Sequence, residues 1–440
     1  RYRFGNLIRK LDNIYEKRGI RIELFEWEDY DAAYNGMRKQ DEYNERVRAS
    51  DMFLALFHKK AGKFTIEEFN IARKAFDEQA SPKIYTYIKD LEAGESESRE
   101  LAEFKRLMLE ELGHYWCRYS NFDTMQLHFV LQLQMVEATT PIKVEVKESQ
   151  VKIGDSTIAD LNNVPFTSEN ATHRELQSRK EQLDREIGNA ESGGRRGFFG
   201  QRSRTTDEEL ANLREERESV TEQIERQEKA LVDTAMSIAR MQGGECSPRM
   251  RTAAELFEKG EIDKAEAVLK EDDMEADATN AKLKFDTAAQ PTAELTRNIE
   301  RCAGEYMLKA RIVVSGIADE SRYRQAVKLM STAIDLVSGR LPEETLAEYL
   351  FDYAVLLTDT GQQTKALETW ERLSGIYERL YRKAPQKYAY GYAGVLNNMA
   401  VLYSDKGDFP FQIPLYLSSH RDSGNPTKKA SRSLYRVRQD

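Results

Sequence analysis

Two adjacent glutamates, Glu67 and Glu68, follow an apolar strand and a short loop, and they are the strongest candidates for chemistry in this chain. Residues 52–57 are apolar without interruption, which predicts a strand buried on both faces in the middle of a parallel sheet. Ligands of open α/β sheets bind beyond the carboxyl ends of the strands, so residues 58–64 and the next helix start should form the pocket wall. A carboxylate there can hydrogen-bond ribose hydroxyls and stabilise positive charge at an anomeric carbon.

A structural role for the same residues also fits, and on spacing alone it is favoured. Thr65-Ile66-Glu67-Glu68 matches the S/T-x-x-E capping box, in which Thr65 caps the helix and Glu68 accepts from the backbone N–H of the cap residue. Glu67 would then be a solvated residue that interacts with the helix dipole. His58 either lines the pocket or is a loop histidine bound to water or backbone.

The elements that position these residues alternate between helical and strand patterns over residues 1–137, which predicts an α/β domain. Residues 20–27 and 83–88 are rich in β-branched and aromatic residues and predict two further strands. A helix over about 96–119 and an apolar segment at 122–136 are expected to close this domain.

Two segments of this domain resemble the TIR and TIR-like domains. S-D-M-F-L-A-L-F (50–57), followed after a short loop by E-F-N-I-A (68–72), is similar to the third strand and third helix of that family, where a Glu stands four residues before an Ala. I-E-L-F-E-W-E-D-Y (22–30) resembles the second strand and the loop after it. The fold this implies is a flavodoxin-like parallel sheet. Because the chain opens on a helix, we expect its first strand to be missing.

The resemblance also implies an activity. In TIR domains that hydrolyse NAD the glutamate of the third helix is catalytic, and by position that residue is Glu68. NAD would be the substrate, and no cofactor or metal is implied. The candidate contacts to the nucleotide are Trp27, Asp29, Tyr30, Phe57 and His58.

Composition limits the remaining choices. A length of 440 residues predicts about three domains. A net charge of −9 with 32% charged residues predicts a soluble, acidic protein without general attraction to nucleic acid or anionic lipid. The three cysteines are far apart and odd in number, which argues against a disulfide framework and fits the cytoplasm. The five histidines form no cluster with them, so a zinc site is not expected.

The middle of the chain changes character. Alternating residues on both sides of Glu148 predict a β-hairpin connector over 138–167. Charged helical patterns over 168–245 predict a coiled-coil hairpin with a glycine-rich basic tip. Its expected contact residues are Leu176, Leu183 and Ile187 on one arm and Leu213, Val220, Ile224 and Leu231 on the other.

The C-terminal third carries an internal repeat. Gly260, Ala265 and Leu269 have the same spacing as Gly361, Ala366 and Trp370. This pattern resembles a tetratricopeptide array over 250–409, an α-solenoid of helix pairs that offers a concave surface to a peptide or protein. Residues 410–440 are expected to be an irregular polar tail.

Two classes of function follow. The first is an effector enzyme that cleaves the nicotinamide–ribose bond of NAD when the repeats sense a partner, and proteins of this kind resemble bacterial anti-phage defence effectors. The second is a non-catalytic scaffold for protein–protein interaction and signalling. Self-association through 168–241 is expected for the enzyme. The orientation of the Glu68 side chain should distinguish the two, because a catalytic carboxylate faces the pocket and a capping one turns back onto its helix.

Overall fold

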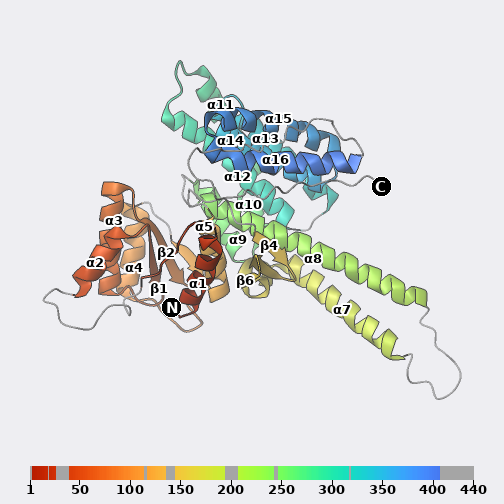
Figure 1. The fold of residues 1–440 in the computed structure, drawn as a ribbon, viewed down its shortest axis with the longest axis horizontal. Coiled ribbons are helices and arrows are strands. Elements are labelled where there is room, and N and C mark those ends of the chain that lie inside the picture. Colours follow the sequence, from red (N-terminus) through yellow and green to blue (C-terminus); the bar gives the residue numbers. More distant parts are fainter. Residues whose placement is uncertain are drawn as a thin grey trace, which may run out of the picture. The chain divides into compact units, whose positions relative to one another are not determined.

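The computed structural model describes most of the chain, and most of the described residues are helical (Figure 1). Strands form two sheets of three strands each. The chain divides into two compact units, residues 1–362 and residues 363–440. None of the helices in the described ranges is both long and apolar enough to cross a lipid bilayer. The described ranges are 2–17, 19–25, 39–112, 116–134, 144–193, 207–241, 246–316 and 319–406.

The parallel sheet predicted for the N-terminal part is present. It contains β1 (Met52–Phe57), β2 (Lys83–Lys89) and β3 (Cys117–Tyr119), in the order β1-β2-β3. Both strand pairs are parallel, and the register joins Met52 to Lys83 and Tyr87 to Cys117. The carboxyl ends of the three strands therefore lie at one edge of the sheet.

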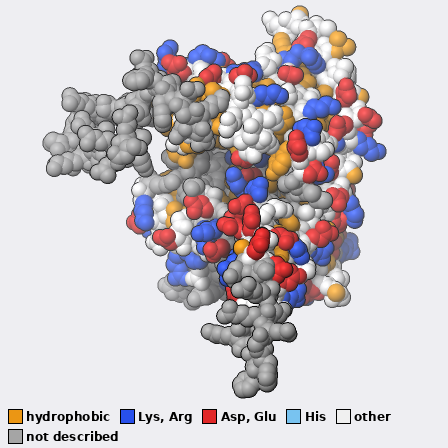
Figure 2. Space-filling model, turned by 90° about the vertical axis from the view of Figure 1, so that its right-hand side faces the viewer, with side chains coloured by type: hydrophobic (Ala, Val, Ile, Leu, Met, Phe, Trp, Pro, Cys, Tyr) orange, Lys and Arg blue, Asp and Glu red, His pale blue; other side chains and the backbone are white. Residues whose placement is uncertain are grey.

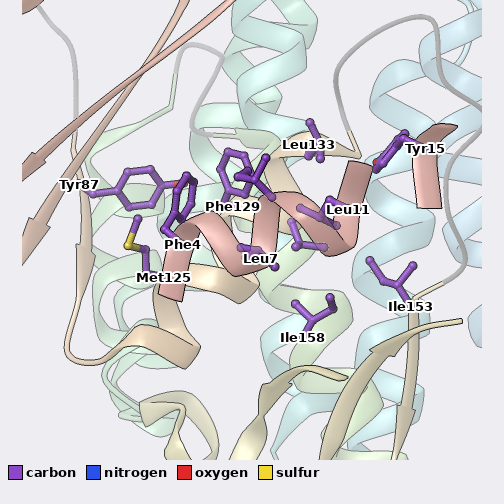
Figure 3. Packing of buried hydrophobic residues seen from close by; sticks show 12 residues of the cluster. Phe4, Leu7, Leu11, Tyr15, Tyr87, Met125, Phe129, Leu133, Ile153 and Ile158 are labelled. Carbon is purple, nitrogen blue, oxygen red and sulfur yellow. The ribbon is translucent and has the colours of Figure 1, made fainter. Parts of the chain in front are cut away.

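Helices cover both faces of this sheet (Figure 1). They are α1 (Tyr2–Glu16), α2 (Lys39–Ala49), α3 (Lys63–Gln79), α4 (Arg99–Arg106) with a π-helical turn at Leu107–Glu111, and α5 (Phe122–Leu133). On one face, α1 and α5 bury Phe4, Leu11 and Phe129 (Figure 3). On the other face, α3 and α4 bury Phe69 and Leu101 against β1. α2 packs beside α3.

Two strand predictions are corrected. β1 is an edge strand of the described sheet rather than a central one, and Leu56 is 38% exposed. Residues 20–25 form no strand, although Ile20, Ile22 and Leu24 still pack against the core below α1. Alternating apolar residues are enough to dock an extended segment, but a strand also needs a backbone partner.

The helix predicted over about 96–119 is confirmed only over Arg99–Glu111. Its helical part ends at Glu111, and Cys117–Tyr119 is strand β3. Three residues carry too little periodicity to be distinguished from a helix end, and their extended conformation comes from pairing with β2.

A second, antiparallel sheet follows. The hairpin predicted around Glu148 consists of β4 (Val144–Lys147) and β5 (Gln150–Ile153). Its two turn residues, Glu148 and Ser149, have φ values of 54° and 56°, the left-handed region that a two-residue hairpin turn requires. A third strand, β6 (Ser156–Asp160), was not predicted. Ile153 and Ile158 of this sheet extend the core under α1 (Figure 3).

Two long helices leave this sheet after a 3₁₀ turn at Leu161–Asn163 and the short helix α6 (Pro165–Ser168). They are α7 (Ala171–Gly193) and α8 (Asp207–Met241), which run side by side (Figure 1). Leu183, Val220 and Ile224 are buried between them, with Leu176 and Leu213 packed against this cluster. At its other end α8 packs against α5, and the amide of Gln132 donates to the carbonyl of Ala239 at 3.1 Å. The predicted basic tip at 194–204 lies outside the described residues.

Helix pairs occupy the remainder of the described chain. The first unit contains α9 (Pro248–Glu258), α10 (Ile262–Val268), α11 (Glu271–Thr287), α12 (Ala293–Ser315), α13 (Glu320–Val337) and α14 (Glu343–Asp359). In it, α9 packs against α10, α12 against α11 and α13, and α13 against α14. The second unit pairs α15 (Gln363–Lys383) with α16 (Pro385–Lys406). Ala265, Leu269 and Ala366 are fully buried, as their spacing suggested. The assignment of these pairs to the tetratricopeptide type stays a prediction.

Charged side chains of both signs are interspersed on the face drawn in Figure 2. Between α7 and α8, Arg179 pairs with Glu216 at 2.5 Å and Arg217 pairs with Asp184 at 3.0 Å. Such exposed pairs contribute little to stability, because solvent screens both charges.

Candidate functional site

The start of α3 differs from the predicted capping box. The helix begins at Lys63, and its cap residue is Gly62, which makes no side-chain capping hydrogen bond. The backbone N–H of Ile66 already donates to Gly62 O at 3.0 Å. Thr65 therefore lies inside the first turn, and Glu68 lies too far along the helix to reach back to its cap. The capping role predicted for Thr65 and Glu68 is wrong.

Both glutamates instead turn toward α2. Gln40 Nε2 donates to Glu68 Oε1 at 3.0 Å, and Asn44 Nδ2 donates to Glu67 Oε1 at 3.0 Å. Gln40 Nε2 also lies 3.3 Å from Asn44 Oδ1. The two donors are 7% and 5% exposed, so the packing of α2 holds their amide groups in place. Among the described residues, Glu68 Oε2 has no hydrogen-bond partner.

Gln40 and Asn44 were missed by the sequence analysis. They stand four residues apart, which places them on one face of a helix. This polar pair within an acidic helix was the only feature of the sequence that could have indicated a contact there. That signal does not name the partner, because α2 and α3 meet only in the fold.

Phe57 belongs to the core. It is 3% exposed, and its ring centroid lies 4.8 Å from that of Phe104, which in turn stacks edge-on against Phe69. This burial argues against the predicted contact between Phe57 and a nucleotide. Trp27, Asp29 and Tyr30 lie outside the described residues.

His58 lies in a polar cluster that joins two loops at the carboxyl edge of the sheet. Its Nε2 lies 3.1 Å from Glu95 Oε2, and Lys59 Nζ lies 2.5 Å from Glu95 Oε1. The backbone N–H of Glu92 donates to Glu95 as well, at 3.0 Å, and that of Ser98 donates to Lys59 O at 2.8 Å. The loop after β1 is thus fastened to the loop after β2.

The charge of Glu95 is stabilised by this cluster. The hydrogen bond from Lys59, followed by the one from the backbone of Glu92, lowers the pKa of Glu95 to about 2. The carboxylate is therefore ionised at all physiological pH values. It holds His58 by a charge-assisted contact when the imidazole is protonated.

The described residues contain no group of three or more His, Cys, Asp or Glu side chains that could hold a metal ion. Cys117, Cys246 and Cys302 form no disulfide bond with one another. Comparison with known proteins gives no match to a family, to a curated protein or to a solved structure.

Proposed function

We propose that the α/β part of this chain is a TIR-like enzyme that hydrolyses the nicotinamide–ribose bond of NAD, with Glu68 as its catalytic carboxylate. The observation that carries the proposal is the hydrogen bond from Gln40. It fixes one oxygen of Glu68 near the start of the helix that follows β1, and the described residues supply no hydrogen-bond partner for the other oxygen. A carboxylate restrained in this way is pre-organised, which is what charge stabilisation in a transition state requires.

The chemistry asked of Glu68 is limited. As the bond between C1′ of the ribose and the nicotinamide nitrogen breaks, its electron pair leaves with the nicotinamide, whose ring becomes neutral. Positive charge develops at C1′, and an adjacent carboxylate stabilises it. Water then adds at C1′ and releases a proton, so the products are ADP-ribose, nicotinamide and one proton.

The tetratricopeptide-like repeats predicted over 250–409 form the interaction part of the proposal. Helix pairs within a unit offer a surface to a peptide or protein. A partner bound there would control the α/β part, in the manner suggested by the resemblance to bacterial anti-phage defence effectors. Self-association of the chain belongs to the same proposal.

Glu68→Gln tests the enzyme, and Glu67→Gln is its matched control. Both glutamates are partly buried and lie on the same turn, and each has a carboxylate oxygen that accepts a hydrogen bond from an amide of α2. Nicotinamide release from NAD by the full natural chain should fall at least about 100-fold in Glu68→Gln and less than about threefold in Glu67→Gln. Equal loss in both variants would mean that the α2–α3 contact matters rather than the Glu68 charge.

A scaffold without catalysis is the second candidate, and one observation favours it. Glu67 and Glu68 are held by α2 in the same way, which is also the behaviour of two residues that stabilise a helix contact. If the folded wild-type protein releases no nicotinamide at any concentration, including those at which it self-associates, and none when a partner occupies the repeats, the scaffold is supported and the enzyme rejected.

A further inference from the structure

A cavity of about 190 Å³ opens at the carboxyl ends of β2 and β3, where α5, α6, α8 and α9 meet. Its wall is largely apolar and includes Leu127 and Leu131 of α5, Phe166 of α6 and Ile238 of α8, all of which are buried. For comparison, an apolar cavity of about 150 Å³ holds benzene. The space therefore accommodates a single ring. Glu68 is not among the residues that line it.

The polar end of the cavity is formed by α9 and by the residues that follow β2. Glu258, the last residue of α9, lines it together with Asp90 and Arg118. Arg118 Nη2 lies 2.6 Å from Asp90 Oδ1, so these two charges compensate each other. Glu255 and Lys259 also line this end, and both are exposed.

His128 lines the cavity too, but its ring nitrogens are engaged. Nδ1 lies 3.0 Å from the hydroxyl of Tyr87, and Nε2 lies 3.2 Å from Cys117 Sγ. Burial raises the pKa of the Cys117 thiol, so this cysteine is not a thiolate nucleophile. The cavity consequently has binding groups rather than the components of covalent catalysis.

Three carboxylates, Asp90, Glu255 and Glu258, line the polar end together with two cations, Arg118 and Lys259. We infer that the cavity is a binding site for a ring-sized monocation, such as a primary amine on an aromatic body, whose ring lies against Leu131 and Phe166 and whose ammonium faces Glu258. An amine of this shape matches an apolar wall with a small number of polar groups at one end, the usual composition of a ligand site.

Burial, followed by the neighbouring charge of Glu255, raises the pKa of Glu258 to about 7. The groups that face it are Asp90, Cys117 and Arg118 from the sheet and Glu255 and Lys259 from α9; His128 lines the same cavity, and α6 and α8 contribute only apolar residues. A bound cation competes with the proton on Glu258. Binding therefore strengthens as pH rises through 7.

Benzylamine is the probe that tests this site, with benzyl alcohol as the neutral analogue and benzoate as the anionic one. Calorimetric titration of the full chain should detect the binding of benzylamine and no binding of either analogue. If only ionised Glu258 binds, the affinity rises by up to about tenfold between pH 6 and pH 8, because the ionised fraction changes from about one tenth to about nine tenths.

Two variants locate the site. Glu258→Gln should abolish the preference for benzylamine over benzyl alcohol, whereas Glu255→Gln, an exposed residue of the same helix, should reduce it at most about threefold. Residue 235 lies on α8 and lines the cavity, so the larger side chain of Ala235→Leu should weaken the binding of benzylamine without changing the charge of the cavity. Equal binding of all three probes, binding unchanged by both Glu258→Gln and Ala235→Leu, or no binding of benzylamine at pH 8 would overturn the inference.

Discussion

Gln40 donates a hydrogen bond of 3.0 Å to Glu68 across 28 residues of sequence, and this contact defines where the candidate catalytic carboxylate points. Asn44, one helical turn later, does the same for Glu67. The contacts Gln40–Glu68 and Asn44–Glu67 are similar and can be compared within one protein. Only the contact to Glu68 is proposed to serve catalysis.

Gln40→Ala should lower kcat for nicotinamide release about tenfold with little change in KM, because the carboxylate loses its orientation but keeps its charge. Asn44→Ala should leave kcat within about twofold. Each variant removes one hydrogen-bond donor to a partly buried carboxylate and should lower the free energy of unfolding by about 1–3 kcal/mol. Equal losses of kcat in the two variants would show that Gln40 supports the fold and does not position Glu68.

Glu95→Gln should destabilise the protein at pH 7, and the difference from wild type should disappear in acid. A lowered carboxyl pKa contributes stability that is complete above the ordinary value of 4.5 and is lost as pH falls toward about 2. Denaturant unfolding of both proteins at pH 7 and at pH 3 measures this difference. If wild type and Glu95→Gln differ in their free energy of unfolding by as much at pH 3 as at pH 7, the ionic role assigned to Glu95 is contradicted.

Gly260→Ala should be more destabilising than Gly361→Ala. Both glycines have positive φ, 78° and 68°, so both substitutions strain the backbone by about 1 kcal/mol. A Cβ on Gly260 would also lie 2.5 Å from the carbonyl oxygen of Pro165, whereas one on Gly361 would meet nothing within 4 Å. The excess should appear as a lower Tm for Gly260→Ala, and equal Tm values would exclude a tight contact between α6 and the α9–α10 turn.

Leu183→Ala should destabilise the α7–α8 pair by about 2–4 kcal/mol, since Leu183 is fully buried between Val220 and Ile224. The exposed neighbour Gln182→Ala is the control and should change stability by less than about 0.5 kcal/mol. Hydrogen exchange of the α7 and α8 amides provides the measurement. Unchanged protection in Leu183→Ala would mean that this cluster is not what holds the two helices together.

The fold was predictable where a long periodic pattern exists and much less so elsewhere. The apolar run of β1 identified a strand, and the spacing of Leu183, Val220 and Ile224 identified a helix pair. β3 was missed because its three residues are extended only through their pairing with β2. The sequence pattern also predicted that the helix starts at Thr65. In the structure, Lys63 and Phe64 are already helical, and the cap residue Gly62 makes no side-chain capping hydrogen bond.

The candidate site was predictable in part. Glu68 could be singled out from local spacing and from the family resemblance, but its partner Gln40 depends on how α2 packs against α3. Phe57 shows the opposite error. Its place at the end of a strand suggested a ligand contact, and only the packing of Phe104 reveals that the ring faces inward.

The continuity of α8 has a mechanical consequence. Its 35 residues form one helix about 50 Å long, anchored at one end against α5 through Gln132 and Ala239 and paired at the other with α7. Such a helix acts as a lever arm, and a tilt of about 5° at the α5 end displaces the far end by about 4 Å. A side-chain movement beside the parallel sheet would thus be amplified at the distant end of the hairpin.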